Sequence, residues 1–166
     1  SQGFDEFNSG VYTPITLAAI LNVVDFAPEE LAALAKRAAD ILFESVAVHC
    51  FDGVVISPQG RIYRDVLYPG RQALQSLVHY LDEDAPYVYS EWLISLATSS
   101  YRIPESCKKL MELEGAYSYT ASNAVIDLYK TKEYMLTSVE APRRDQKGRA
   151  WERDETERKQ RHHIAE

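Results

Sequence analysis

The sequence predicts a mainly α-helical protein that passes into a β region after Gly115. Apolar residues recur at helical spacing through much of residues 14–114. The stretch after Gly115 is rich in β-branched and aromatic residues that partly alternate with polar ones. We therefore expect a helical region over residues 1–115, the start of a β region over 116–140, and a charged tail or linker over 141–166.

Residues 28–50 give the clearest helix. Pro28 suits its first position, and Glu29 and Glu30 lie in the first turn, where carboxylates interact favourably with the helix dipole. Its expected core face has helical spacing and consists of Leu31, Leu34, Ala38, Ile41, Leu42, Ser45 and Val48. Further helices are predicted over residues 14–25, 71–82, 87–98 and 104–114.

The β-forming segments are short. Strands are predicted near residues 123–130 and 133–139, joined by a turn at Thr131–Lys132. Another short strand is expected at 54–56, after a turn at Asp52–Gly53. Because a two-stranded piece is rarely stable alone, it must pack on the helices, continue in further sequence or pair with another chain. We expect a fragment of a larger protein that can self-associate through this incomplete β region.

Composition restricts the partners. The chain carries 18 Lys and Arg against 25 Asp and Glu, and it is typical of a soluble globular protein. Residues 1–142 account for ten of these cations and nineteen of the anions, so an acidic body argues against nucleic-acid binding. No apolar run is long enough to span a bilayer, so no membrane partner is expected. The segment SQGFDEFNSG does not resemble a signal peptide, and the compartment stays open.

Several common chemistries have no local motif. The sequence contains no G-x-S-x-G, no Gly-rich phosphate loop and no H-E-x-x-H. Cys50 and Cys107 lack metal-like spacing, and the pair His162–His163 has no suitably spaced carboxylate or cysteine partner. We therefore predict no metal site and no cofactor.

The segment EFNSGVYTP, residues 6–14, places polar side chains directly before the first predicted helix. Glu6, Asn8 and Tyr12 could face a groove at the helix ends and bind sugar hydroxyls or a carboxylate. Alternatively, Asn8 or Ser9 caps the helix or shapes the turn, as short polar side chains do at such positions. The sequence leaves both interpretations open.

A second candidate is GRIYRD, residues 60–65, in the loop after the long helix. A neighbouring cation lowers the pKa of a tyrosine, so Arg61 and Arg64 could make Tyr63 a base. Arg also binds carboxylates bidentately. This grouping fits β-elimination on a uronate, in which a cation neutralises the sugar carboxylate and the phenolate removes the adjacent proton. The alternative is a surface ladder of Arg and Asp with a packing tyrosine.

His49 ends the long helix, where the helix dipole favours a protonated imidazole. It could be a general base or a carboxylate binder. It could equally be a charged cap of the helix.

Three segments together resemble a known family. FDEFNSGVYTPITLAAIL resembles the E-x-N-S-x-x-Y helix opening of α/α-toroid carbohydrate-active proteins, including heparinase II/III-like polysaccharide lyases. ISPQGRIYRD is similar to an Arg- and Tyr-containing segment that follows a later helix in those proteins, and VIDLYKTKEYMLTSVEA resembles their passage from toroid to sandwich. The resemblance covers most of residues 4–140. It implies a partial (α/α) toroid of antiparallel helices followed by the first strands of a β-sandwich.

The resemblance also implies a function. Lyases of this type bind an acidic polysaccharide in a cleft and cleave it by β-elimination without a cofactor. Carried over by position, Asn8 would neutralise the uronate carboxylate and Tyr63 would be base or acid. Arg61 and His49 would assist. Substrate binding would involve Glu6, Asn8, Tyr12 and Arg64.

Two alternatives keep other chemistry open. A glycoside hydrolase could use a carboxylate pair such as Glu6 with Asp65. A non-catalytic helical module could instead bind a glycan or a protein partner. The Asn-His pair of several such lyases is not found, and the other toroid helices are absent from this chain. Lyase activity is therefore expected of the full-length protein, and activity of this chain alone stays open.

Overall fold

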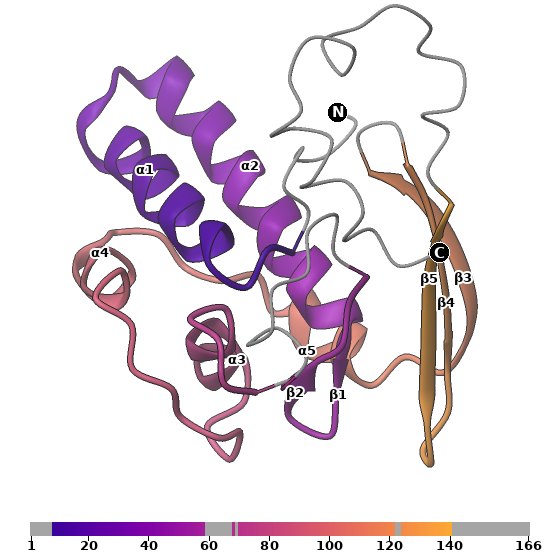
Figure 1. The fold of residues 1–166 in the computed structure, drawn as a ribbon. Helices are drawn as coiled ribbons and strands as arrows, with labels where there is room; N and C mark the ends of the chain where they lie inside the picture. Colours follow the sequence, from indigo (N-terminus) through magenta and orange to yellow (C-terminus); the bar gives the residue numbers. More distant parts are fainter. Residues whose placement is uncertain (1–7, 59–67, 69, 122–123, 141–166) are drawn as a thin grey trace, which may run out of the picture.

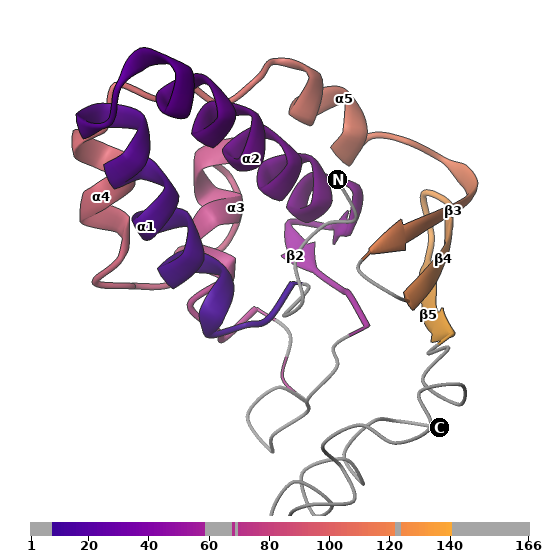
Figure 2. The same cartoon turned by 90° about the horizontal axis from the view of Figure 1, so that it is seen from above.

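A layer of helices lies beside two small antiparallel sheets in the computed structural model, which describes residues 8–58, 68, 70–121 and 124–140 (Figure 1). The long helices α1 (Tyr12–Phe26) and α2 (Glu29–Val48) form a hairpin. Three short helices follow, α3 (Gln75–Leu81), α4 (Leu93–Thr98) and α5 (Ser106–Met111). The three-stranded sheet stands to one side of the helices in both views (Figure 2).

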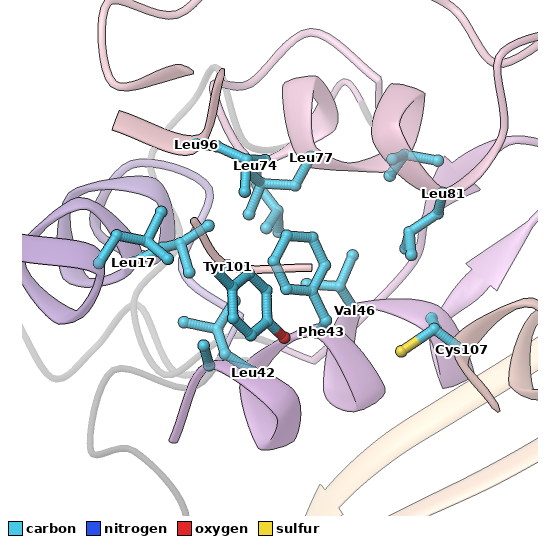
Figure 3. Packing of buried hydrophobic residues seen from close by; sticks show 14 of the residues in the cluster. Leu17, Leu42, Phe43, Val46, Leu74, Leu77, Leu81, Leu96, Tyr101 and Cys107 are labelled. Carbon is cyan, nitrogen blue, oxygen red and sulfur yellow. The ribbon is translucent and has the colours of Figure 1, made fainter. Parts of the chain in front are cut away.

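The hydrophobic core lies among the helices (Figure 3). Phe43 of α2 is fully buried, and its ring stacks on that of Tyr101 with centroids 6.0 Å apart. Burying one such side chain contributes about 1.5–3 kcal/mol. The leucines around this pair come from α1 to α4 and the residue before α3, and they are Leu17, Leu21, Leu42, Leu74, Leu77, Leu81, Leu93 and Leu96.

Helix α2 buries a different face from the one that its sequence predicts. The predicted face begins with Leu31 and Leu34, which are 52% and 64% exposed. The buried face is instead formed by Ala35, Ala39, Leu42, Phe43, Val46 and Ala47. Its three alanines allow neighbouring elements to approach closely, while Phe43 supplies the volume that fills the core. The expected orientation of α2 is therefore wrong, and of its predicted core residues only Leu42 is fully inside.

The first sheet is a hairpin of β1 (Cys50–Phe51) and β2 (Val54–Val55). Its two-residue turn consists of Asp52 and Gly53, with φ of 49° and 71°. Positive φ at both central residues is typical of a type I′ turn, which matches the twist of the flanking strands. The predicted turn is confirmed, and the expected single strand is half of a hairpin.

The second sheet has the order β3 (Gly115–Ala121), β4 (Ala124–Lys130) and β5 (Met135–Glu140). Its register pairs Tyr119 with Ile126 and Ile126 with Val139. Alternation along β4 buries Ile126 and Leu128 on one face and exposes the other. The two strands expected after residue 122 are confirmed, whereas β3 is additional to the prediction.

Lys130, at the end of β4, anchors this sheet to the helices. Its ammonium donates hydrogen bonds to the carbonyl oxygens of Cys50 at 2.6 Å and Met111 at 2.5 Å. Cys50 comes just after the end of α2, and Met111 is the last residue of α5. The C-terminal end of a helix has unpaired carbonyl groups and a partial negative charge, so both sites attract an ammonium group. Burial lowers the pKa of Lys130, because it disfavours the charged form.

The predicted fold class is wrong. The structure is 45% helical and 20% strand, a small mixed α/β domain rather than part of an α/α toroid followed by a sandwich. Helices α3, α4 and α5 have only seven, six and six residues, much shorter than their apolar patterns predicted. In the segment before α4, Tyr87 and Tyr89 are 59% and 74% exposed, so these aromatic side chains add little core packing that would support a longer helix.

A search for membrane-spanning helices among the described residues finds none of sufficient length and apolar character.

Candidate functional site

The structure brings two of the predicted site residues together. Asn8 and His49, both buried, lie in one group of polar side chains whose other members are partly buried, and we call this group the polar cluster: Asn8, Ser45, His49, Ser57 and Tyr119. The cluster joins the segment before α1, the end of α2, the exit of the first hairpin and β3. The bond between His49 and Tyr119 alone joins positions 70 residues apart along the chain.

His49 is the C-cap of α2 and is 0% exposed. Its Nδ1 lies 3.0 Å from the carbonyl oxygen of Ile56, and its Nε2 lies 2.6 Å from the hydroxyl of Tyr119. Because a carbonyl oxygen can only accept, Nδ1 carries the proton. Nε2 is then an acceptor, and the Tyr119 hydroxyl donates to it.

The electrostatics of this pair favour its uncharged form. The pKa of His49 is lowered to about 4: burial is the main cause, the bond to Ile56 partly opposes it, and the nearby Lys130 charge adds a smaller lowering. Burial also raises the pKa of Tyr119, against a smaller opposite effect of Ser45. Near neutral pH the pair is therefore an imidazole and a phenol. His49 does cap α2, as the sequence allowed, and its lowered pKa favours an uncharged ring at that position.

Asn8 holds the other side of the polar cluster. It is 4% exposed and has a positive φ of 43°, a backbone conformation that Asn tolerates better than most residues. Its amide Nδ2 donates to Ser57 Oγ at 3.1 Å, and its Oδ1 accepts from Ser45 Oγ at 2.9 Å. Ser45 thus lies between the amide of Asn8 and the phenol of Tyr119.

The segment before α1 also shapes its own turn. The Tyr12 backbone N–H donates to Ser9 Oγ, and the Thr13 N–H donates to the Ser9 carbonyl. Ser9 therefore has the local role that the sequence allowed, while the Asn8 side chain reaches away to α2. Tyr12 lies at the start of α1 and is exposed.

The remaining predicted residues lie outside the described part of the chain. These are Glu6, Arg61, Tyr63 and Arg64, together with the hydrolase candidate Asp65 and the pair His162–His163. Their roles stay predictions. Sequence reasoning missed Ser45, Ser57 and Tyr119, because no local motif links β3 to the end of α2.

The chemistry available in the polar cluster is proton transfer and hydrogen bonding. Among the described residues, no group of three or more His, Cys, Asp or Glu side chains could hold a metal ion. Both cysteines are buried, and burial raises the pKa of each thiol to about 11. They are therefore poor nucleophiles, since the thiolate is the reactive form.

The outer face of the three-stranded sheet forms a second surface, which is slightly hollowed. Two neighbouring cross-strand rows line it: Ser118, Asp127 and Ser138, then Ala116, Tyr129 and Leu136. It combines a carboxylate, hydroxyls and an aromatic ring on an accessible face.

No protein family, curated protein or solved structure matched this chain in the comparisons made. The resemblance to heparinase II/III-like lyases therefore rests on the short sequence segments alone.

Proposed function

We propose that this chain belongs to a carbohydrate-active protein that cleaves a uronate-containing polysaccharide by β-elimination. One observation carries the proposal: an asparagine, a histidine and a tyrosine converge in the polar cluster. β-Elimination needs a group that stabilises the carboxylate and a group that moves protons. In the proposed reaction the Asn8 amide, which donates to Ser57 in this structure, turns to the carboxylate, and the Tyr119–His49 pair moves the protons.

The proposed step uses Tyr119 in place of the predicted Tyr63. As the Tyr119 hydroxyl proton moves to Nε2 of His49, the phenolate oxygen removes the proton on the sugar carbon next to the carboxylate. The electron pair forms a carbon–carbon double bond, and the bond to the leaving glycosidic oxygen breaks. Tyr119 then protonates that oxygen and recovers its own proton from His49. No co-reactant is consumed.

The environment sets the pH range of this step. His49 must be neutral to accept a proton, and burial lowers its pKa to about 4. Activity should therefore persist well below the usual histidine pKa of about 6.5 and fall only near pH 4.

The experiment incubates the protein with a panel of polyuronates and follows the absorbance of unsaturated products. We expect a rise with at least one substrate and its loss in Tyr119→Phe. The matched control is Tyr117→Phe, two residues earlier on the same strand, whose hydroxyl donates to the Glu114 carbonyl. No rise across the panel, or equal rates for Tyr119→Phe and Tyr117→Phe, would refute the proposal.

A second candidate function is non-catalytic glycan binding by the outer face of the sheet. The deep burial of Asn8 and His49 favours it, because a structural network needs no access for substrate. Tyr129 offers a ring for the apolar face of a sugar, and Asp127 and the serines offer partners for its hydroxyls. Tyr129→Ala should then weaken glycan binding, while Tyr89→Ala, at an exposed tyrosine outside the sheet, should not. The hydrolase alternative depends on Glu6 and Asp65 and stays a prediction.

A further inference from the structure

Helix α2 carries an apolar stripe on the side that the core does not use. The stripe follows intervals of three and four residues and consists of Leu31, Leu34, Ala38, Ile41, Ser45 and Val48. None of these side chains is fully buried, and Leu31 and Leu34 are 52% and 64% exposed. Alternating intervals of three and four are the a and d spacing of helices that pack along each other.

The exposed part of the stripe lies in the first half of α2. In Figure 1 this half lies away from the three-stranded sheet, and the helix ends near β1. The second half of α2 contacts other parts of this chain, because Ser45 donates a hydrogen bond to Asn8 and lies beside Tyr119. Phe26, the last residue of α1 and 84% exposed, adds apolar surface near the start of α2.

The charges beside the stripe indicate what covers it. Glu30 and Arg37 precede Leu31 and Ala38, at the g position of two successive heptads, and both are exposed. In an antiparallel pair of helices, g positions face g positions of the other helix. A layer that pairs Leu31 with Leu34 of the partner subunit places Glu30 beside Arg37 of the partner subunit, and the two-fold axis repeats the contact.

The competing helical arrangements fit less well. A parallel pair would set g against e, and the e positions Ala35 and Leu42 are apolar and buried, so Glu30 and Arg37 would meet no opposite charge there. An antiparallel pair shifted by one layer, with Leu34 against Ala38 of the partner subunit, would place Arg37 against its own copy. Both the apolar layer and the charges therefore favour one register.

We propose that two copies of this chain associate through the first half of α2, packed antiparallel with Leu31 against Leu34 of the partner subunit. The contact buries the exposed leucines of both copies and forms two Glu30–Arg37 ion pairs. It is separate from the polar cluster and does not depend on the proposed activity.

Sedimentation equilibrium over micromolar to millimolar concentrations tests this contact. We expect a monomer–dimer equilibrium that Leu34→Glu shifts to monomer. The matched control is Leu136→Glu, because Leu136 is 65% exposed but lies on the sheet, and it should leave the dimer intact. A monomer at every concentration would overturn the proposal. So would a dimer lost in Leu136→Glu and kept in Leu34→Glu, which would indicate association through the β region.

Charge reversal tests the register. Arg37→Glu replaces two attractions with two repulsions, so the dimer should weaken about tenfold, given the small value of each exposed pair. Adding Glu30→Arg to that variant should restore the affinity. Glu44→Gln should change little, although it removes the contact of Arg37 with Glu44 at 3.9 Å within the chain. Failure of the double variant to recover would overturn this register.

Discussion

Acid should destabilise this protein through protonation of His49. The folded-state pKa of this buried imidazole is about 4, against about 6.5 for an unperturbed histidine. Between these two values the unfolded chain binds one more proton than the folded chain. The free energy of unfolding therefore falls as pH falls, by about 1.4 kcal/mol per pH unit for this group, and about 3 kcal/mol is lost between pH 7.5 and pH 4.

Urea unfolding followed by tryptophan fluorescence at several pH values measures this loss. His49→Gln removes the titrating group, so its stability should change with pH by about 3 kcal/mol less than that of the wild type over this range. The control Leu136→Gln changes an exposed side chain that does not titrate, and it should follow the wild-type slope. A constant difference between wild type and His49→Gln from pH 7.5 to pH 4 would refute a buried, neutral His49.

Three further substitutions test, by the same unfolding assay, the Lys130 contacts, the Tyr101 hydrogen bond and the turn at Gly53. Lys130→Met should lower the free energy of unfolding by about 1–3 kcal/mol. Two carbonyl groups lose their hydrogen-bond donor, and this loss is partly offset because a charged group no longer has to be buried. An unchanged stability would contradict the anchoring role of Lys130. Tyr101→Phe should lower the free energy of unfolding by about 1–2 kcal/mol, since the Tyr101 hydroxyl donates to Asp40 at 2.8 Å. Tyr117→Phe should lower it less, because the hydrogen bond of that hydroxyl is exposed. Gly53→Ala should lower the free energy of unfolding by about 1–2 kcal/mol, because φ is 71°, a backbone conformation that a residue with a Cβ rarely adopts.

Local signals in the sequence predicted local structure well. The Asp52–Gly53 turn forms as expected, since both residues accept the positive φ that the turn requires. Pro28 precedes α2, and its acidic first turn is present. These features depend on a few neighbouring residues, so the sequence alone contains them.

Features that depend on distant contacts were missed. Helix α2 has two apolar faces, and its packing against α1, α3, α5 and Tyr101 decides which is buried. In strand β3, tyrosines alternate with small residues, a pattern that only weakly predicts a strand. The strand forms because it pairs with β4 along its whole length. Tyr119 meets His49 only because this strand crosses near the end of α2. No spacing rule links such positions.

The proton position within the Tyr119–His49 pair is the most direct test of the account. Nitrogen-15 NMR of the histidine rings near pH 7 reports which ring nitrogen of His49 carries hydrogen. We expect a neutral ring protonated at Nδ1, with Nε2 accepting from Tyr119, and a shift of the Nε2 resonance in Tyr119→Phe. A charged ring at pH 7, or a proton on Nε2 in place of Nδ1, would contradict the polar cluster and the proton transfer proposed for it.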